Sequence, residues 1–324
     1  MSDFILEAKN LMKTFSLDAG FFAKNEKKVY AVNDVSFGIE RGKTYGLVGE
    51  SGCGKTTTAR ILVQMYKQSS GTVLYNPDET AGTFCDVSKL HKSELKKYRE
   101  KVKYVFQDPS RSLNPRMSVF SILTNAYKYS SLWKGKAEAW ELSAHILEEV
   151  GLDPSDLNRR PSEFSGGQRQ RISIARGLLM QPKVLICDEV VSALDVSIQG
   201  QILNLLQDIK EKRGLSFLFI AHDLRVSCYF CDTIGVMYSG LLMEEAPAAD
   251  LYKTALHPYT KLLFEGSQGK LDKENESGEV KTILRGLEGC PFAHRCPHAS
   301  EKCRKEIPEW KNAGGGHKVR CHLF

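Results

Sequence analysis

A glycine-rich segment, residues 49–56, holds the first residue types in this sequence that could do chemistry, and it reads GESGCGKT. Its glycines allow the backbone to turn successive N–H groups toward a bound anion. A predicted helix follows, and its N-terminus adds the positive end of the helix dipole. In this pattern Lys55 reaches the β and γ phosphates of a nucleotide, and the Thr56 hydroxyl binds Mg²⁺. The segment therefore predicts a site for nucleotide phosphates.

Two acids and a histidine come at the ends of other apolar runs. Asp188 and Glu189 follow the run at 184–187, and His222 comes shortly after the run at 216–220. Asp188 can hold the magnesium ion, and Glu189 is then placed to orient and deprotonate an attacking water. His222 is a candidate contact for the γ phosphate. These residue types also occur at strand ends in structural roles, so their interpretation depends on the phosphate site.

A serine and two glycines precede a predicted basic helix at 169–180. Ser165 suits the N-cap position, and Gly166 and Gly167 leave the helix N-terminus bare for an anion. Two adjacent glycines cost helix stability, so their presence indicates close approach by a ligand. The four residues from Ser165 to Gln168 are therefore a second predicted anion site.

Three apolar runs must position these groups. The runs at 44–48, 184–187 and 216–220 have the length and composition of buried strands. Each delivers polar residues at its C-terminal end, where ligands bind in an open, mostly parallel α/β sheet. Between the first and second runs, apolar residues recur at helical spacing. We therefore predict an α/β fold with a helical subdomain inserted at about residues 108–180.

Composition sets the class of protein. The chain has 324 residues, 42% of them hydrophobic and 26% charged, which is typical of a soluble folded protein. No run approaches the roughly 18 to 20 apolar residues of a membrane helix, and the N-terminus lacks the pattern of a secretory signal. The net charge of +6 selects no partner by itself, and no block of like charges forms a nucleic-acid arm. We expect a cytoplasmic location.

The composition changes along the chain and predicts three parts. A nucleotide-binding domain spans 1–265, a polar linker containing Gly and Ser spans 266–282, and a cysteine-rich module spans 283–324.

With these parts in this order, the chain resembles an ABC-type ATPase, the P-loop nucleotide-binding subunit of an ABC transporter. The resemblance covers about residues 4–264. Residues 49–56 resemble the Walker A loop, Gln107 the Q-loop glutamine, residues 165–168 the signature, and residues 192–195 the D-loop. The acidic pair resembles the Walker B aspartate with the catalytic glutamate, and His222 the switch histidine.

The resemblance implies a role for each matching residue. Glu189, His222 and Gln107 would be catalytic. Thr56, Gln107 and Asp188 would bind Mg²⁺. The residues implied to contact ATP are Phe15, Gly49, Ser51, Gly52, Cys53, Gly54, Lys55, Thr56, Thr57 and Asp188, together with Ser165, Gly166, Gly167 and Gln168 of a signature.

Some positions are less typical of this family. Phe15 resembles the aromatic residue that stacks on adenine, although a phenylalanine in a strand core would also explain it. Val190 stands where the family usually has proline, Gly177 where it has alanine, and Ala246 where it has glycine. None of these differences removes a reacting group, so the expected activity stands.

Further segments, at 105–109, 112–117, 195–199 and 257–260 and in the tail, resemble the dipeptide and oligopeptide importer branch. The branch implies a pair of similar ATPase subunits beneath two membrane permeases, on the cytoplasmic face, with an external solute-binding protein. Two cassettes close head to tail, so that each ATP is held by one chain's phosphate loop and the other chain's signature.

Two other function classes stay open. One is a soluble ABC ATPase acting on DNA or ribosomes. Only 110 residues separate Lys55 from Ser165 (165 minus 55), too few for the coiled-coil arm of repair-type relatives, and ribosome-acting relatives usually carry two cassettes. The other is an ATPase that serves a metal or redox sensor in the tail.

Four tail cysteines, Cys290, Cys296, Cys303 and Cys321, are separated by 5, 6 and 17 residues. Clustered thiols in a reducing compartment favour zinc or an iron–sulfur cluster. Structural zinc sites usually have closer pairs, and the importer branch implies a [4Fe–4S] cluster here. We expect its role to be structural, because about 40 residues with few large apolar side chains could hardly hold a fold without a metal. Zinc stays open because histidines lie among the cysteines, and so does a merely buried set of thiols. These histidines are His294, His298, His317 and His322.

Overall fold

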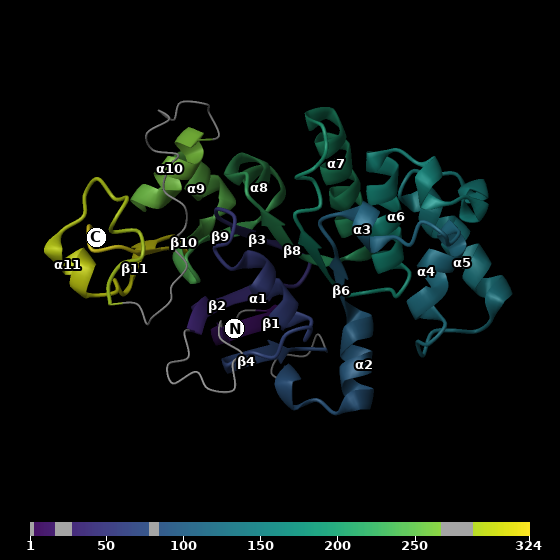
Figure 1. Cartoon of the computed structure of the whole chain (residues 1–324), viewed down its shortest axis with the longest axis horizontal. Helices are drawn as coiled ribbons and strands as arrows, with labels where there is room; N and C mark the ends of the chain where they lie inside the picture. Colours follow the sequence, from purple (N-terminus) through teal and green to yellow (C-terminus); the bar gives the residue numbers. More distant parts are fainter. Residues whose placement is uncertain (1–2, 17–27, 78–83, 267–287) are drawn as a thin grey trace. The chain divides into compact units, whose positions relative to one another are not determined.

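The computed structural model describes residues 3–16, 28–77, 84–266 and 288–324. It divides into two compact units, one formed by the described parts of Met1–Lys89 and Phe219–Phe324, the other by Leu90–Leu218. Figure 1 labels most of their helices and strands. The predicted linker at 266–282 lies, apart from Gly266, outside the described residues.

The first unit contains an antiparallel sheet built from the N-terminal part of the chain. Its strand order is β2-β1-β4-β5. Two long strands, β1 (Phe4–Ser16) and β2 (Lys28–Glu40), form most of it, and β4 (Ser70–Tyr75) and β5 (Cys85–Asp86) complete it before the short 3₁₀ helix η1 (Val87–Lys89). Residues such as Leu11 and Val35 are fully buried on it. The apolar side chains on one face drive its packing.

A second sheet of the first unit carries the phosphate loop. In it β3 (Thr44–Val48) pairs in parallel with β9 (Thr233–Tyr238), which pairs antiparallel with β10 (Leu241–Pro247). Ser239 and Gly240, with φ of 45° and 82°, join β9 to β10. Positive φ at both positions is typical of the tight turn of a β-hairpin. Helix α1 (Lys55–Leu62) follows β3.

The C-terminal tail extends this second sheet. Strand β12 (His317–Arg320) pairs antiparallel with β10, and β11 (Trp310–Gly314) pairs with β12. The unit is completed by α8 (Leu224–Phe230), α9 (Ala248–Lys253), α10 (Pro258–Gly266) and α11 (Glu301–Lys305). The tail therefore shares backbone hydrogen bonds with the sheet that carries the phosphate loop.

The second unit combines two parallel strands with a run of helices. Strands β6 (Val102–Val105) and β7 (Val184–Asp188) pair in parallel, and α2 (Lys92–Lys101) precedes β6. Asp108, Ser118, Asp153 and Ser165 cap helices here with their side chains, because each accepts a backbone N–H of the first turn. The elements between β6 and β7 are α3 (Pro109–Ser112), α4 (Val119–Tyr127), α5 (Lys136–Glu149), η2 (Pro154–Asn158), η3 (Pro161–Glu163) and α6 (Gly166–Leu178).

The α/β class predicted from the sequence is confirmed. The three apolar runs are strands: β3, β7 and β8 (Ser216–Ala221), with α7 (Val196–Arg213) between the last two. Strand β8 spans the boundary between the two units. In the part of the chain that the structure describes, none of the helices has the length and apolar character that a membrane crossing requires.

A buried histidine connects α10 to the tail. His257 is 1% exposed, its backbone N–H donates to the Glu244 carboxylate, and its Nδ1 accepts the Tyr259 backbone N–H at 3.0 Å. The same carboxylate accepts a hydrogen bond from the Leu256 N–H and lies 2.7 Å from Nε2 of His317 in β12. Burial lowers the pKa of His257 to about 4. The folded chain therefore keeps this imidazole neutral.

This burial predicts a loss of stability in mild acid. The unfolded chain binds a proton near the ordinary pKa of 6.5, whereas the folded chain excludes it until about 4. As the pH falls from about 7 to 5, His257 should remove about 2 kcal/mol from the free energy of unfolding. His257→Asn keeps a hydrogen-bond acceptor but cannot titrate, so its loss should be smaller by that amount. Urea titrations at both pH values measure this, and equal losses in the two proteins would contradict it.

Candidate nucleotide site

The phosphate loop between β3 and α1 fits closely against two backbone carbonyls of its own unit. A Cβ on Gly54 would lie 2.2 Å from the Ala31 carbonyl oxygen, and one on Gly49 would lie 2.1 Å from that of Met237. Gly54 also has φ of 112°, a conformation that side chains disfavour. It stands at the N-cap of α1, so no side chain caps the start of this helix. The loop thus exists in this form because both positions are glycine.

Lys55 lies inside the loop. Its side chain is 3% exposed, and Nζ donates to the carbonyl oxygens of Gly49 at 2.7 Å and Glu50 at 3.0 Å. The neighbouring Cys53 is fully buried, and burial raises the pKa of its thiol although the Lys55 charge opposes the shift. Ser51, Gly52, Thr56 and Thr57 are exposed or half-buried. A cation held this way offers charge to an anion that enters the loop.

Two further predicted residues lie in the first unit. Phe15, near the end of β1, is 36% exposed, packs edge-on against Tyr66 at 5.7 Å, and has the Lys13 ammonium 5.0 Å from its ring centroid. A strand-core role does not fit this exposure. His222 is exposed, and the next residue, Asp223, caps α8.

The acidic pair in the second unit is held by side chains from β6 and the residues that follow it. The Tyr104 hydroxyl donates to the Asp188 carboxylate, which is 3% exposed at the end of β7. Gln107 Nε2 donates to Glu189 Oε2 at 2.6 Å. The parallel register, with Val105 opposite Cys187, brings these partners together. The structure thus joins two predicted residues, Gln107 and Glu189, directly.

Glu189 has a strained backbone. Its φ is 49°, which is uncommon for a residue with a side chain. The Ser192 hydroxyl and backbone N–H both donate to the Glu189 carbonyl oxygen, at 2.9 and 3.2 Å. Strain of this kind persists where the surroundings fix it, and it clusters at functional sites.

The signature residues begin α6 as predicted. Ser165 is the N-cap, its hydroxyl accepts the Gln168 backbone N–H at 3.3 Å, and Gln168 Oε1 accepts the Ser165 N–H at 2.9 Å. A Cβ on Gly167 would lie 2.8 Å from Cγ2 of Ile198 in α7, whereas one on Gly166 would meet only Leu194, at 3.9 Å. Gly167 therefore packs closely against α7, whereas a Cβ on Gly166 would have room.

The predicted residues are divided between the units. The phosphate loop, Phe15 and His222 belong to the first unit, and Gln107, the acidic pair and the signature belong to the second. Sequence reasoning missed Tyr104, which contacts Asp188, and Arg295, whose guanidinium contacts Glu50. Tyr104 could have been found because it lies on β6, the strand that pairs with β7 and comes just before Gln107.

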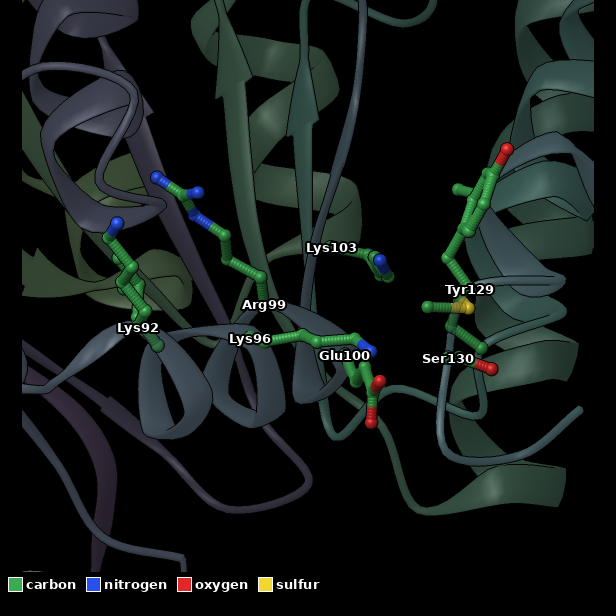
Figure 2. A pocket seen from close by; sticks show the side chains of 10 residues that line it. Lys92, Lys96, Arg99, Glu100, Lys103, Tyr129 and Ser130 are labelled. Atoms are coloured by element: carbon green, nitrogen blue, oxygen red, sulfur yellow. The ribbon is translucent and has the colours of Figure 1, made fainter.

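A pocket of about 370 Å³ in the second unit lies apart from these residues. Figure 2 shows that the helix α2 supplies several of its basic side chains. Its buried acid, Glu100, accepts hydrogen bonds from the Ser131 N–H and hydroxyl. None of the predicted site residues lines it. Its lining residues are Lys92, Leu95, Lys96, Arg99, Glu100, Lys103, Ala126, Tyr129, Ser130 and Met180.

The four tail cysteines gather in one region of the first unit. The Cys290 N–H donates to the Cys303 carbonyl oxygen at 2.8 Å. Burial, assisted by the thiols of Cys303, Cys321 and Cys296 and opposed by a hydrogen bond from the Phe292 backbone, raises the pKa of Cys290 to about 11. Burial and the other thiols also raise the pKa values of Cys296 and Cys321. Even so, among the described residues no group of three or more His, Cys, Asp or Glu is placed to hold a metal ion.

Most of the tail histidines that could bind zinc contact other polar groups. His317 Nε2 lies 2.7 Å from the Glu244 carboxylate, and His322 Nε2 lies 3.1 Å from the Glu306 carbonyl oxygen. His294 Nε2 lies 3.4 Å from the Tyr238 hydroxyl. These contacts direct three of the four imidazoles to groups other than a shared metal site.

A glycine-rich loop between a strand and a helix, with an acidic pair at a strand end, defines a P-loop nucleotide-binding protein. Comparison with known families agrees. A family model described as "ABC transporter" matches residues 32–192, and one described as "Oligopeptide/dipeptide transporter, C-terminal region" matches residues 243–303.

Individual relatives cover nearly the whole chain. The oligopeptide transport ATP-binding protein AppF of Bacillus subtilis is 41% identical over 99% of this chain and 97% of its own length. The oligopeptide transport ATP-binding protein OppF of the same organism is 46% identical over 82% of each chain. A similar fold occurs in a solved structure of the ATP-binding cassette MJ0796, a dimer in a post-hydrolysis state bound to ADP and phosphate. The TM-score is 0.63 and the sequence identity is 26%, and the match covers 75% of this chain and 98% of that one.

The chain therefore belongs to the family of ATP-binding proteins of oligopeptide and dipeptide ABC transporters. It is an ABC-type ATPase, whose hydrolysis of ATP is coupled to transport. Neither the DNA- or ribosome-acting alternative nor the metal-sensor alternative has support among these relatives.

Proposed function

We propose that this chain is the ATP-hydrolysing subunit of an importer complex for oligopeptides or a related solute. The observation that carries the proposal is the phosphate loop, closed around Lys55, in a chain that also matches the C-terminal region of oligopeptide transporters. AppF and OppF are named as oligopeptide transport proteins and suggest the same cargo.

Different residues of the chain bind ATP and hydrolyse it. Lys55 and the loop N–H groups bind the phosphates, and Phe15 offers an exposed ring for the adenine. Glu189 orients and deprotonates the attacking water, and Gln107, its hydrogen-bond partner, positions it. His222 contacts the γ phosphate.

A set of oxygen donors suits Mg²⁺. The hydroxyl of Thr56, the amide of Gln107 and the carboxylate of Asp188 are hard oxygen ligands of the kind that this ion prefers. Asp188 is 3% exposed and oriented by the Tyr104 hydroxyl, so its carboxylate is fixed in advance. When bound, Mg²⁺ neutralises phosphate charge.

The site is completed by a second cassette. The MJ0796 cassette is a dimer bound to ADP and phosphate, and we infer a similar head-to-tail pair in which Gly166 of one chain faces the ATP held by the other. ATP touches both partners and favours closure, and hydrolysis removes that contact and favours opening. The partner is a similar but distinct ATPase. The pair binds two permeases at the cytoplasmic face of the membrane, and an external solute-binding protein delivers the solute.

The role of Glu189 can be tested in the assembled complex. Glu189→Gln should keep ATP binding but slow hydrolysis by about 10² to 10⁴, because the amide cannot accept the proton of the attacking water. Phosphate release and nucleotide binding are measured side by side. Glu141→Gln, at an exposed position of α5, is the matched control and should hydrolyse ATP like the wild type. Wild-type turnover of Glu189→Gln would remove the proposed base.

We also propose a [4Fe–4S] cluster in the tail. Neighbouring thiols help to raise the pKa values of Cys290, Cys296 and Cys321, yet among the described residues no group of three or more His, Cys, Asp or Glu is placed to hold one metal ion. A cluster fits such a set because each iron takes one thiolate, and the iron atoms stand apart. Its role is structural: when bound, the cluster supplies four covalent links between loops that have few large apolar side chains.

Metal analysis decides between the tail alternatives. The chain purified without oxygen should contain iron and acid-labile sulfide at about four atoms each, the composition of one such cluster. Cys290→Ser combined with Cys303→Ser should lose both and make the tail more sensitive to protease. Stoichiometric zinc without sulfide would contradict the cluster, and an unchanged tail in the variant would contradict its structural role.

A further inference from the structure

Arg295 of the tail forms an ion pair with Glu50 of the phosphate loop. Arg295 Nη1 donates to Glu50 Oε2 at 2.8 Å, and Nη2 donates to Glu50 Oε1 at 3.0 Å. The arginine side chain is 13% exposed and the glutamate side chain 28%. A two-pronged pair of this kind is among the stronger and more directional contacts that proteins make.

Glu50 is held at every polar group. Its backbone N–H donates to the hydroxyl of Tyr259 at 2.9 Å, and its carbonyl oxygen accepts from Lys55 Nζ at 3.0 Å. Tyr259 is fully buried. The second residue of the phosphate loop is therefore fixed by the loop lysine, by α10 and by the tail together.

The loop that carries Arg295 is itself anchored. Phe292 is 1% exposed, and its ring centroid lies 5.4 Å from those of both Tyr238 and Tyr259. The Phe292 carbonyl oxygen accepts the N–H groups of Arg295 and Cys296, both at 3.0 Å. This turn between Cys290 and Cys296 places the guanidinium at a defined point beside the phosphate loop.

The charge of Glu50 works against the ligand of the loop. A carboxylate in a segment that binds a triphosphate repels it, and it could itself accept the N–H groups meant for the phosphates. The Arg295 guanidinium cancels this charge and turns both carboxylate oxygens to itself. The pair thus makes an acidic phosphate loop fit for an anion.

We propose that Arg295 is a positioning residue of the ATP site, through which the tail sets the affinity of the phosphate loop for ATP. This inference rests on the proposed function. Because Arg295 lies between two cysteines of the tail, any chemistry that displaces the turn between them also uncovers the charge of Glu50. ATP binding and tail order are then linked in both directions.

The test is a set of charge variants titrated with the Mg²⁺ complex of AMP-PNP, a non-hydrolysable ATP analogue, by calorimetry. Arg295→Ala should weaken binding roughly tenfold or more, because it leaves an unpaired negative charge in the loop. Glu50→Gln should bind like the wild type, and Glu50→Gln combined with Arg295→Ala should restore the affinity to within about threefold. Arg295→Lys keeps the charge and should lie between. The deficit of Arg295→Ala should shrink at high salt.

A second ion pair of the tail supplies the matched control. Arg320 in β12 contacts Asp34 in β2, with its Nη2 atom 3.1 Å from Oδ2. Arg320→Ala removes an ion pair of the tail that does not involve the phosphate loop and should change AMP-PNP affinity far less than Arg295→Ala does. Circular dichroism of each variant verifies the fold.

The results distinguish failure of this inference from failure of the proposed function. Unchanged affinity in Arg295→Ala would overturn the inference while leaving the proposed function intact. So would a double variant that binds as weakly as Arg295→Ala, because Arg295 would then act only by packing. Lack of binding to the wild-type chain would overturn the proposed function itself, and this inference with it.

Discussion

The phosphate loop depends on the absence of two side chains. Gly49 and Gly54 bring the backbone so close to the carbonyl oxygens of Met237 and Ala31 that a Cβ would overlap them. This contact fixes the loop on β9 and β2, holds Lys55 inside it, and leaves the first turn of α1 without a side-chain cap. Because the loop rests on these strands, whatever orders β9 and its hairpin partner β10 also orders the phosphate site.

The tail is one of those ordering elements. It adds β12 to β10, buries Phe292 against two tyrosines, and places Arg295 on Glu50. The buried Glu244 carboxylate, shared by backbone N–H groups before α10 and by His317, ties the same region together. A cysteine-rich segment that the sequence suggests is a separate module thus continues the sheet of the nucleotide-binding part. The ion pair of Arg295 with Glu50 connects this segment to the phosphate loop.

The sequence was informative where short motifs carry their own geometry. The strands β3, β7 and β8 and the cap at Ser165 could be predicted because apolar runs and capping residues act locally. Contacts such as that of Tyr104 with Asp188 depend on strand register, and that of Arg295 with Glu50 joins residues 245 positions apart. Such pairs follow from packing, which no local pattern encodes. Gly167 has a further reason to be glycine that the sequence does not show, since a Cβ there would overlap Ile198.

We expect ATP to bind in the phosphate loop through Lys55. The most direct test is the rise in melting temperature that Mg²⁺ with ATP gives the purified chain, compared with that of Lys55→Ala. Loss of the charged hydrogen bonds should weaken ATP binding by roughly 10-fold to 100-fold and so remove most of the rise. Lys67→Ala, at an exposed position of the same unit, should behave like the wild type. A folded Lys55→Ala chain that ATP stabilises as much as the wild type would show that Lys55 does not hold ATP in this loop.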